Sequence, residues 1–217
     1  MNAYIFDLDD TLVDTSESFD RVVMQLVEKH SKRGLTRAEL LSLRAEGGFN
    51  CDWDSTIELL RRRNITRERA EIAEEGLDIY LKIASDAESL FVENSFFETL
   101  TKHAPLYIVT GRERSEYAPI WASRLDPFFV EVVCRDDRSE LAPKPSPAQI
   151  LDLMERRGIS GGYFIGNSVD DMTAGVGAGL TAIGVSTNQS SETLRQAGAK
   201  EVVAKAQALL QLPSFLF

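Results

Sequence analysis

The chain opens on a short apolar stretch that runs directly into a group of side-chain oxygens. Residues 4–6 are expected to form a buried strand, and Asp7, Asp9 and Thr11 follow at a spacing of two. Carboxylates gathered at a strand end repel one another unless a positive charge lies among them. Oxygen ligands favour a hard divalent cation such as Mg²⁺. The segment therefore predicts a metal, a nucleophile and a proton carrier together; the alternative is that Asp9 and Asp10 only cap a solvated turn.

The composition is that of a globular protein with an acidic balance. Of 217 residues, 43% are hydrophobic and 27% are charged, and the formal net charge is −10. Binding to nucleic acids or to anionic membranes requires a positive electrostatic field, which a protein of this charge lacks, so we expect neither as a partner. No apolar run approaches the roughly eighteen residues of a membrane span, and Met1-Asn2 leads into the first strand without a signal sequence. We expect a cytoplasmic protein with Cys51 and Cys134 reduced.

Residues 16–87 show helical patterning and no convincing strand. Apolar residues recur at helical spacing in segments that begin near residues 16, 36, 52 and 66. The clearest start is Thr36-Arg-Ala-Glu39, a capping box. Asp52 or Asp54 is expected to cap the third helix and Thr66 to begin the fourth. We expect these helices to form a small bundle inserted into the chain.

From about residue 96 onward, apolar strands alternate with helices. This alternation predicts a parallel sheet covered on both faces, which the first strand joins. We therefore expect an α/β fold: a doubly wound, Rossmann-like core of residues 1–15 and 88–217, interrupted by an all-helical cap of residues 16–87. The later strands are expected at 106–109, 129–134, 163–165, 181–185 and 201–204.

Polar side chains follow the ends of several expected strands. In open α/β sheets, ligands bind beyond the carboxyl ends of the strands. Asp7, Thr110, Lys144, Asn167 and Asp171 should therefore emerge at one edge. Their coincidence disfavours a merely solvated turn after the first strand. Two alternatives stay open: Thr110 could only cap the end of its strand, and Lys144 could be a solvated side chain.

Four motifs, in this order, resemble those of the haloacid dehalogenase-like (HAD) superfamily. They are Phe6-Asp7-Leu8-Asp9-Asp10-Thr11-Leu12, Val109-Thr110-Gly111, Lys144-Pro145 and Gly166-Asn167-Ser168-Val169-Asp170-Asp171. The resemblance spans the whole chain. A helical insert directly after the first motif is similar to the phosphoglycolate phosphatase and β-phosphoglucomutase branch. The resemblance implies a Mg²⁺-dependent phosphatase acting on a small phosphorylated metabolite.

The resemblance also implies a role for each motif position. Asp7 would attack phosphorus and form an aspartyl-phosphate, and Asp9 would serve as general acid and base. The transferring phosphoryl group would be bound by Thr110, Gly111, Arg112 and Lys144.

The expected Mg²⁺ site departs from the family pattern at one position. The metal would be held by Asp7, the Asp9 carbonyl, Asn167 and Asp171, with Asp170 in reserve. The family usually has aspartate where this chain has Asn167, so one formal charge is lost, and we expect weaker metal binding without loss of activity. The acid at position 9 disfavours carbon–halogen chemistry, because the dehalogenases of the superfamily lack it.

The break between the second and third expected helices is the segment of the cap expected to face the active site. Phe49 and Asn50 would contact the substrate there, although Phe49 and Trp53 could instead belong to the core of the bundle. The segment also resembles a branch related to imidazoleglycerol-phosphate dehydratase, a likeness that assigns no substrate.

Two alternative functions stay open beside the phosphatase. A hexose-phosphate mutase would use the same catalytic residues and return phosphate to the sugar. A non-catalytic module that binds a phosphorylated metabolite would keep the pocket and lose turnover, for which Asn167 is the hint. The chain is expected to be a monomer or a homodimer.

Overall fold

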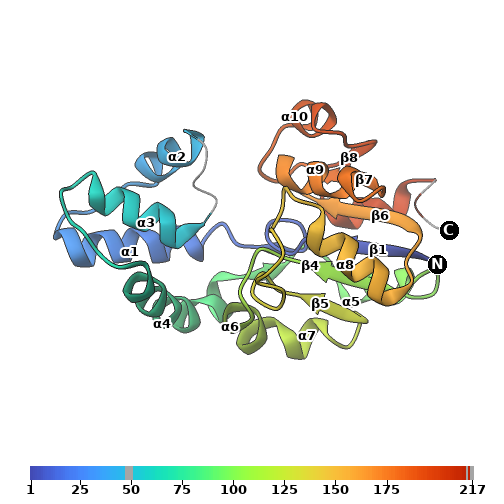
Figure 1. The fold of residues 1–217 in the computed structure, drawn as a ribbon, viewed down its shortest axis with the longest axis horizontal. Coiled ribbons are helices and arrows are strands. Elements are labelled where there is room, and N and C mark those ends of the chain that lie inside the picture. The colour runs from blue at the N-terminus through green and yellow to red at the C-terminus, as the bar shows by residue number, and fades with distance from the viewer. Residues whose placement is uncertain (47–50, 214, 216–217) are drawn as a thin grey trace. The chain divides into compact units, whose positions relative to one another are not determined.

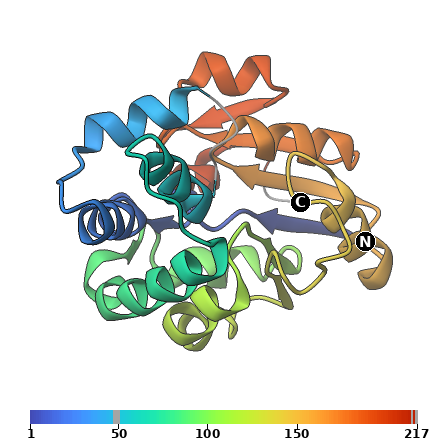
Figure 2. The same ribbon diagram turned by 60° about the vertical axis from the view of Figure 1, so that its left-hand side comes forward.

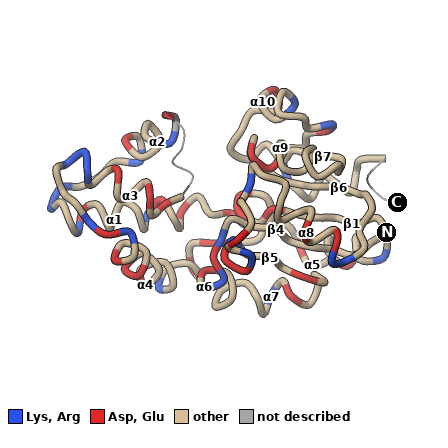
Figure 3. The backbone as a smooth tube through the Cα atoms, in the orientation of Figure 1, with Lys and Arg blue, Asp and Glu red and all other residues tan. Residues whose placement is uncertain are grey.

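The structure, a computed structural model, describes residues 1–46, 51–213 and 215. The chain divides into two compact units (Figure 1). The first combines residues 1–14 with residues 90–217, and the second consists of residues 15–89. Lys and Arg are interspersed with Asp and Glu over both units (Figure 3).

The first unit contains a six-stranded sheet whose strand order is β5-β4-β1-β6-β7-β8. Every neighbouring pair is parallel, and β1 lies in the interior of the sheet (Figures 1 and 2). The predicted doubly wound α/β fold is confirmed. The strands are β1 (Asn2–Phe6), β4 (Leu106–Val109), β5 (Glu131–Val133), β6 (Gly161–Gly166), β7 (Thr181–Val185) and β8 (Glu201–Val203).

Alternate residues of the strands point into two separate hydrophobic clusters. Along β1, Tyr4 and Phe6 belong to one cluster, and Ala3 and Ile5 belong to the other. This is the period of two that a strand buried on both faces requires. Helices also contribute to both clusters: α5 (Asn94–Leu100), α6 (Arg114–Tyr117), α7 (Ser123–Leu125) and the 3-10 helix η2 (Ala206–Gln211) on the first side, and α8 (Ala148–Arg157) and α9 (Val169–Gly177) on the second.

The helical segment after β4 is interrupted. A π-helical turn, η1 (Ala118–Ala122), separates α6 from α7. Pro119 lies in this turn, and proline has no N–H to donate to an α-helical hydrogen bond. The remaining helix of this unit, α10 (Ser191–Gln196), packs Leu194 against the outer part of the sheet, close to Gly184 of β7. A separate two-stranded sheet joins β2 (Val13–Asp14) and β3 (Ser89–Leu90).

The second unit is a bundle of α1 (Phe19–Ser31), α2 (Arg37–Ala45), α3 (Asp52–Arg61) and α4 (Arg69–Ala87). The predicted capping box at Thr36 and Glu39 is present. The predicted caps of the next two helices are wrong, because the N-cap residues are Cys51 and Glu68. Asp52 and Asp54 instead lie in the first turn of α3 and form ion pairs with arginines of neighbouring helices.

Trp53 belongs to the core of this bundle. Its side chain is buried and packs edge-on against Phe19. It also lies on Gly76 of α4, where a Cβ atom would come within 2.2 Å of the indole ring. The packing therefore requires glycine at position 76. The expected substrate contacts Phe49 and Asn50 lie outside the described residues.

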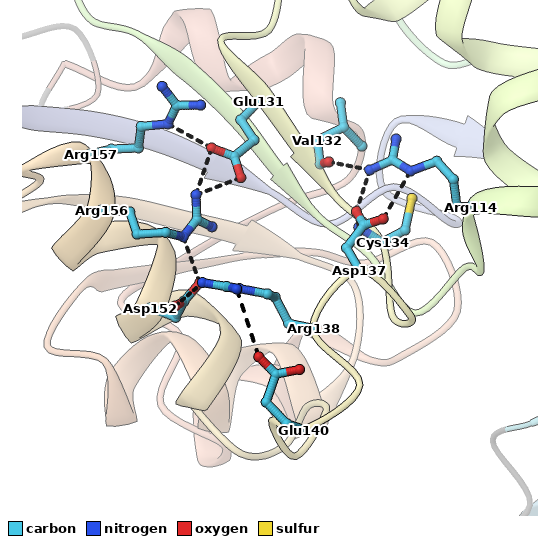
Figure 4. A network of polar contacts seen from close by, with 10 residues as sticks. All are labelled: Arg114, Glu131, Val132, Cys134, Asp137, Arg138, Glu140, Asp152, Arg156 and Arg157. Atoms are coloured by element: carbon cyan, nitrogen blue, oxygen red, sulfur yellow. Dashed lines mark hydrogen bonds and ion pairs between the residues drawn. The ribbon is translucent and has the colours of Figure 1, made fainter.

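A network of ion pairs covers the outer strand of the sheet (Figure 4). Glu131 of β5 accepts from Arg156 and Arg157, and Asp152 accepts from Arg138 and Arg156. These pairs fasten α8 to β5 and balance the arginine charges locally. In the described part of the chain, no helix is both long and apolar enough to cross a membrane.

Candidate active site

The parallel register brings the carboxyl ends of the central strands to one edge. Phe6 lies level with Ile108 of β4 and with Ile165 of β6. The next residue, Asp7, donates its backbone N–H to the Ile165 carbonyl at 2.8 Å. Thr110 continues β4 in the same way, with its N–H on the Val133 carbonyl at 3.0 Å. Rigid backbone ladders therefore fix these positions.

Lys144 joins two carboxylates from different strand ends. Its Nζ lies 2.6 Å from Asp7 Oδ1 and 2.6 Å from Asp171 Oδ1. All three side chains are buried, with 2–11% of each exposed. A buried charge is tolerated only when it is paired and hydrogen-bonded. Burial and the neighbouring Asp171 raise the pKa of Asp7 against the lowering effect of Lys144, and the two carboxylates, against the effect of burial, raise the pKa of Lys144.

Asp171 is held by more donors than any other carboxylate of this cluster. Besides Lys144 on Oδ1, its Oδ2 accepts from the Ser168 hydroxyl at 2.7 Å and from the backbone N–H groups of Ser168 and Asn167. Gly166 makes room for it, because a Cβ atom there would lie 2.4 Å from the Asp171 Cβ. The side chain predicted as a metal ligand is thus bound through both oxygens to protein groups.

Two other oxygens converge on the Thr11 hydroxyl. It lies 3.2 Å from Asp7 Oδ2 and 3.3 Å from Asn167 Oδ1. These three residues are all buried, and each follows β1 or β6 directly or within one turn. Among the described residues, no three His, Cys, Asp or Glu side chains are grouped as a metal site. The donor set available for a hard cation is therefore one carboxylate, one amide oxygen and backbone carbonyls, which fits Mg²⁺.

Arg112 lies in the predicted phosphate-binding loop, yet its guanidinium binds Asp9. The Asp9 Oδ1 atom is 2.6 Å from Nε and 2.5 Å from one terminal nitrogen. The arginine side chain is 1% exposed and that of the aspartate 32%. This pairing was not predicted from the sequence, because 103 residues separate the partners. The assignment of Arg112 to the substrate's phosphate stays a prediction, and the structure adds this contact with Asp9.

The other predicted site residues are placed less centrally. The Thr110 side chain is buried and its hydroxyl accepts from the Arg112 N–H at 3.2 Å, while Gly111 is exposed. Asp170 is half-buried in the first turn of α9. The contacts that join Asp7, Lys144 and Asp171 do not include it.

Glu116 is a buried acid near the site that the sequence analysis missed. It lies in α6, and its carboxylate accepts from the Glu113 N–H at 2.8 Å. Burial raises the pKa of Glu116 to about 8, and the charge of Asp9 adds to this while that of Arg112 opposes it. The available sequence signal was the spacing of Glu113 and Glu116, which suits the first turn of a helix.

This shift predicts a pH-dependent stability that depends on Glu116. The folded protein holds the proton between pH 4.5 and about 8 while the unfolded chain releases it, so stability falls as pH rises through this window. We expect Glu116→Gln, which mimics the protonated acid, to exceed the wild type by roughly 2–4 kcal/mol in urea unfolding above this window and to match it at pH 4. Glu113→Gln is the matched control; an equal gain from both variants would contradict the assignment.

Comparisons with known proteins agree with the fold. The family model of haloacid dehalogenase-like hydrolases matches residues 1–179. A protein of Phytophthora nicotianae named imidazoleglycerol-phosphate dehydratase is 25% identical over 206 residues, which cover 88% of this chain and 44% of that protein. This chain therefore spans less than half the length of that relative.

Solved structures share the whole architecture at low sequence identity. A Haemophilus somnus protein assigned by prediction as a phosphoglycolate phosphatase has a TM-score of 0.80 at 19% identity, with 97% of each chain covered. A Thermotoga maritima protein assigned as a β-phosphoglucomutase has a TM-score of 0.75 at 21% identity, again with 97% of each chain covered. At these identities, the likeness concerns the fold.

Proposed function

Because this chain belongs to the haloacid dehalogenase-like hydrolase family, we propose that it hydrolyses a small phosphorylated metabolite through an aspartyl-phosphate on Asp7. The observation that carries the proposal is the buried Asp7–Lys144–Asp171 cluster at the ends of β1 and β6. An ammonium group between two carboxylates favours the ionised form of Asp7, against the effect of burial, and orients it as a nucleophile requires. The same positive charge would stabilise the phosphoryl oxygens in the transition state.

The chemistry proceeds in two displacements. Asp7 attacks phosphorus as the ester P–O bond breaks, and Asp9 gives its proton to the departing oxygen. Asp9 then takes a proton from water, whose oxygen attacks phosphorus as the Asp7 O–P bond breaks. Free phosphate leaves and both carboxyl groups return to their initial state.

Mg²⁺ is the proposed cofactor, held by Asp7, Asn167 and the Asp9 carbonyl. When bound, it would neutralise charge on the phosphoryl group and orient it. The convergence of Asp7 and Asn167 on the Thr11 hydroxyl supports this choice. Because both oxygens of Asp171 are bound within the protein, we propose that Asp171 orients Lys144 and that Asp170 is not required.

The amide at position 167 predicts a measurable effect on Mg²⁺ affinity. We expect Asn167→Asp to tighten binding roughly tenfold, about 1.4 kcal/mol, because it adds a ligand charge. Isothermal titration calorimetry with Mg²⁺ alone measures this without substrate. Asp170→Asn is the control and should change affinity less than about threefold. An unchanged affinity in Asn167→Asp would remove Asn167 from the proposed site.

We propose that the helical unit acts as the cap that selects the substrate, and that the protein works in the cytoplasm. Screening for inorganic phosphate release from a panel of phosphorylated metabolites with Mg²⁺ tests the function. Imidazoleglycerol phosphate belongs in the panel, because the Phytophthora nicotianae relative carries that name.

A phosphosugar mutase is the second candidate, favoured by the fold shared with the Thermotoga maritima protein. The two activities use the same residues and differ in the acceptor of the phosphoryl group. Phosphorus NMR of the products separates them: inorganic phosphate supports the hydrolase, and an isomerised sugar phosphate supports the mutase. A chain that turns over none of the panel and binds its members would be the non-catalytic module.

A further inference from the structure

The contact between Arg112 and Asp9 is the strongest feature of the site that the proposed mechanism does not use. Two nitrogens of the guanidinium, Nε and one terminal nitrogen, reach the same carboxylate oxygen, Oδ1, at 2.6 and 2.5 Å. The second oxygen, Oδ2, lies outside this contact. An ionic hydrogen bond of this length between a buried arginine and a carboxylate is among the strong interactions of a protein interior.

The arginine is held in place from both sides of its backbone. Its N–H donates to the Thr110 hydroxyl at 3.2 Å, and its carbonyl accepts from the Arg135 N–H at 2.8 Å. Thr110 in turn is fixed by the β4–β5 ladder through the Val133 carbonyl. The guanidinium is therefore mounted on the rigid end of the sheet, whereas Asp9 lies in the loop between β1 and β2.

Asp9 needs such a support. The residue that follows it, Asp10, has a positive φ of 54°, a conformation outside the regular strand. The Asp9 side chain is also one-third exposed, so neighbouring packing alone does not confine it. General acid catalysis depends on geometry, since the donor must lie within hydrogen-bond reach of the oxygen it protonates.

We propose that Arg112 is a positioning residue for Asp9, fixing Oδ1 so that Oδ2 carries the proton to and from the reacting oxygens. The inference rests on the proposed function and assigns Arg112 a task other than binding the substrate's phosphate. In the first displacement, the ester P–O bond breaks, the Asp7 O–P bond forms, and the proton on Oδ2 passes to the departing alkoxide. In the second, water gives a proton back to Oδ2.

This role predicts a dependence on the leaving group. An alkoxide is a poor leaving group and needs the proton, whereas p-nitrophenolate departs without it. Misplacing Asp9 should therefore slow an alkyl phosphate much more than an aryl phosphate. Loss of a phosphate-binding arginine would instead raise KM for both substrates alike.

The test compares glycerol 2-phosphate with p-nitrophenyl phosphate as substrates of the 217-residue chain in the presence of Mg²⁺. For Arg112→Met we expect kcat on glycerol 2-phosphate to fall about a hundredfold, within the usual contribution of a general acid, and kcat on p-nitrophenyl phosphate less than about fivefold. Asp9→Asn should show the same selectivity, and the double variant should lose little more than Asp9→Asn alone. Arg112→Lys keeps the charge with a different donor geometry, so its kcat on glycerol 2-phosphate should lie between those of the wild type and Arg112→Met. This variant provides the test if Arg112→Met does not fold.

Arg114→Met is the matched control. Arg114 lies two residues after Arg112 in the same segment, and it is paired with Asp137 instead of Asp9 (Figure 4). It should leave the ratio of the two activities unchanged. Equal losses on both substrates in the Arg112 variants, or losses that add fully to those of Asp9→Asn, would overturn the positioning role while leaving the proposed function intact. A wild type that releases phosphate from neither substrate nor from the metabolite panel would overturn both.

Discussion

Replacing Asp7 with asparagine removes phosphatase activity, with an expected loss in kcat of at least about 10⁴-fold. Nucleophile substitutions cause losses of this order because the covalent route is closed. The amide keeps the shape of the carboxylate and cannot attack phosphorus at a useful rate. Release of inorganic phosphate from p-nitrophenyl phosphate measures the effect. Because p-nitrophenolate departs without a proton from Asp9, this assay reports on the nucleophile and not on the general acid.

Asp10→Asn is the matched control for this experiment. It makes the same chemical change three residues later, in a side chain that contacts Asn188 of the loop after β7. Asparagine also tolerates the positive φ of this position. We expect activity within about fivefold of wild type. If Asp7→Asn keeps comparable activity, the nucleophile is a different group.

Lys144→Met is the second change with a large expected effect, on both activity and stability. It leaves Asp7 and Asp171 buried beside each other without a cation, which costs about 3–5 kcal/mol in comparable buried pairs. It also removes the charge that faces the phosphoryl oxygens, for which we expect kcat to fall about 10²–10³-fold. Urea unfolding and phosphate release measure the two effects separately.

A second substitution separates these two roles. In Lys144→Met/Asp171→Asn, the remaining repulsion is relieved, so we expect much of the lost stability to return. Activity should stay low, because no cation is restored beside Asp7. Recovery of activity together with stability would mean that Lys144 acts only as a structural counter-charge.

The sequence was sufficient for the core of the fold because its signals are local. Short apolar runs, each ending in a polar residue, correspond to β1, β4, β6 and β7, and Thr36 and Glu39 form the helix cap that their spacing indicates. Helix starts without such a motif were mispredicted. The N-cap position of α3 is Cys51, while Asp52 lies in the first turn and pairs with Arg44, a tertiary contact that local patterns do not contain.

The sequence predicted which residues form the candidate site better than it predicted the contacts between them. Strand-end logic gathered Asp7, Lys144 and Asp171, and the structure joins them within hydrogen-bonding distance. The prediction that Asp171 is a metal ligand did not include its protein donors, which are the Lys144 ammonium, the Ser168 hydroxyl and the backbone N–H groups of Asn167 and Ser168. Nor could strand-end logic pair Arg112 with Asp9, because the partner of a long side chain is decided by the three-dimensional arrangement of the loops.

The central claim is the covalent intermediate on Asp7, and trapping it is the most direct test. Wild-type protein would be mixed with substrate and Mg²⁺, quenched in acid, reduced with borohydride and digested for mass spectrometry. We predict that position 7 is converted to homoserine in the wild type, as reduction of an aspartyl-phosphate requires, and that Asp7→Asn shows no conversion. Turnover without any modification at position 7, or conversion of a different acid, would contradict the account.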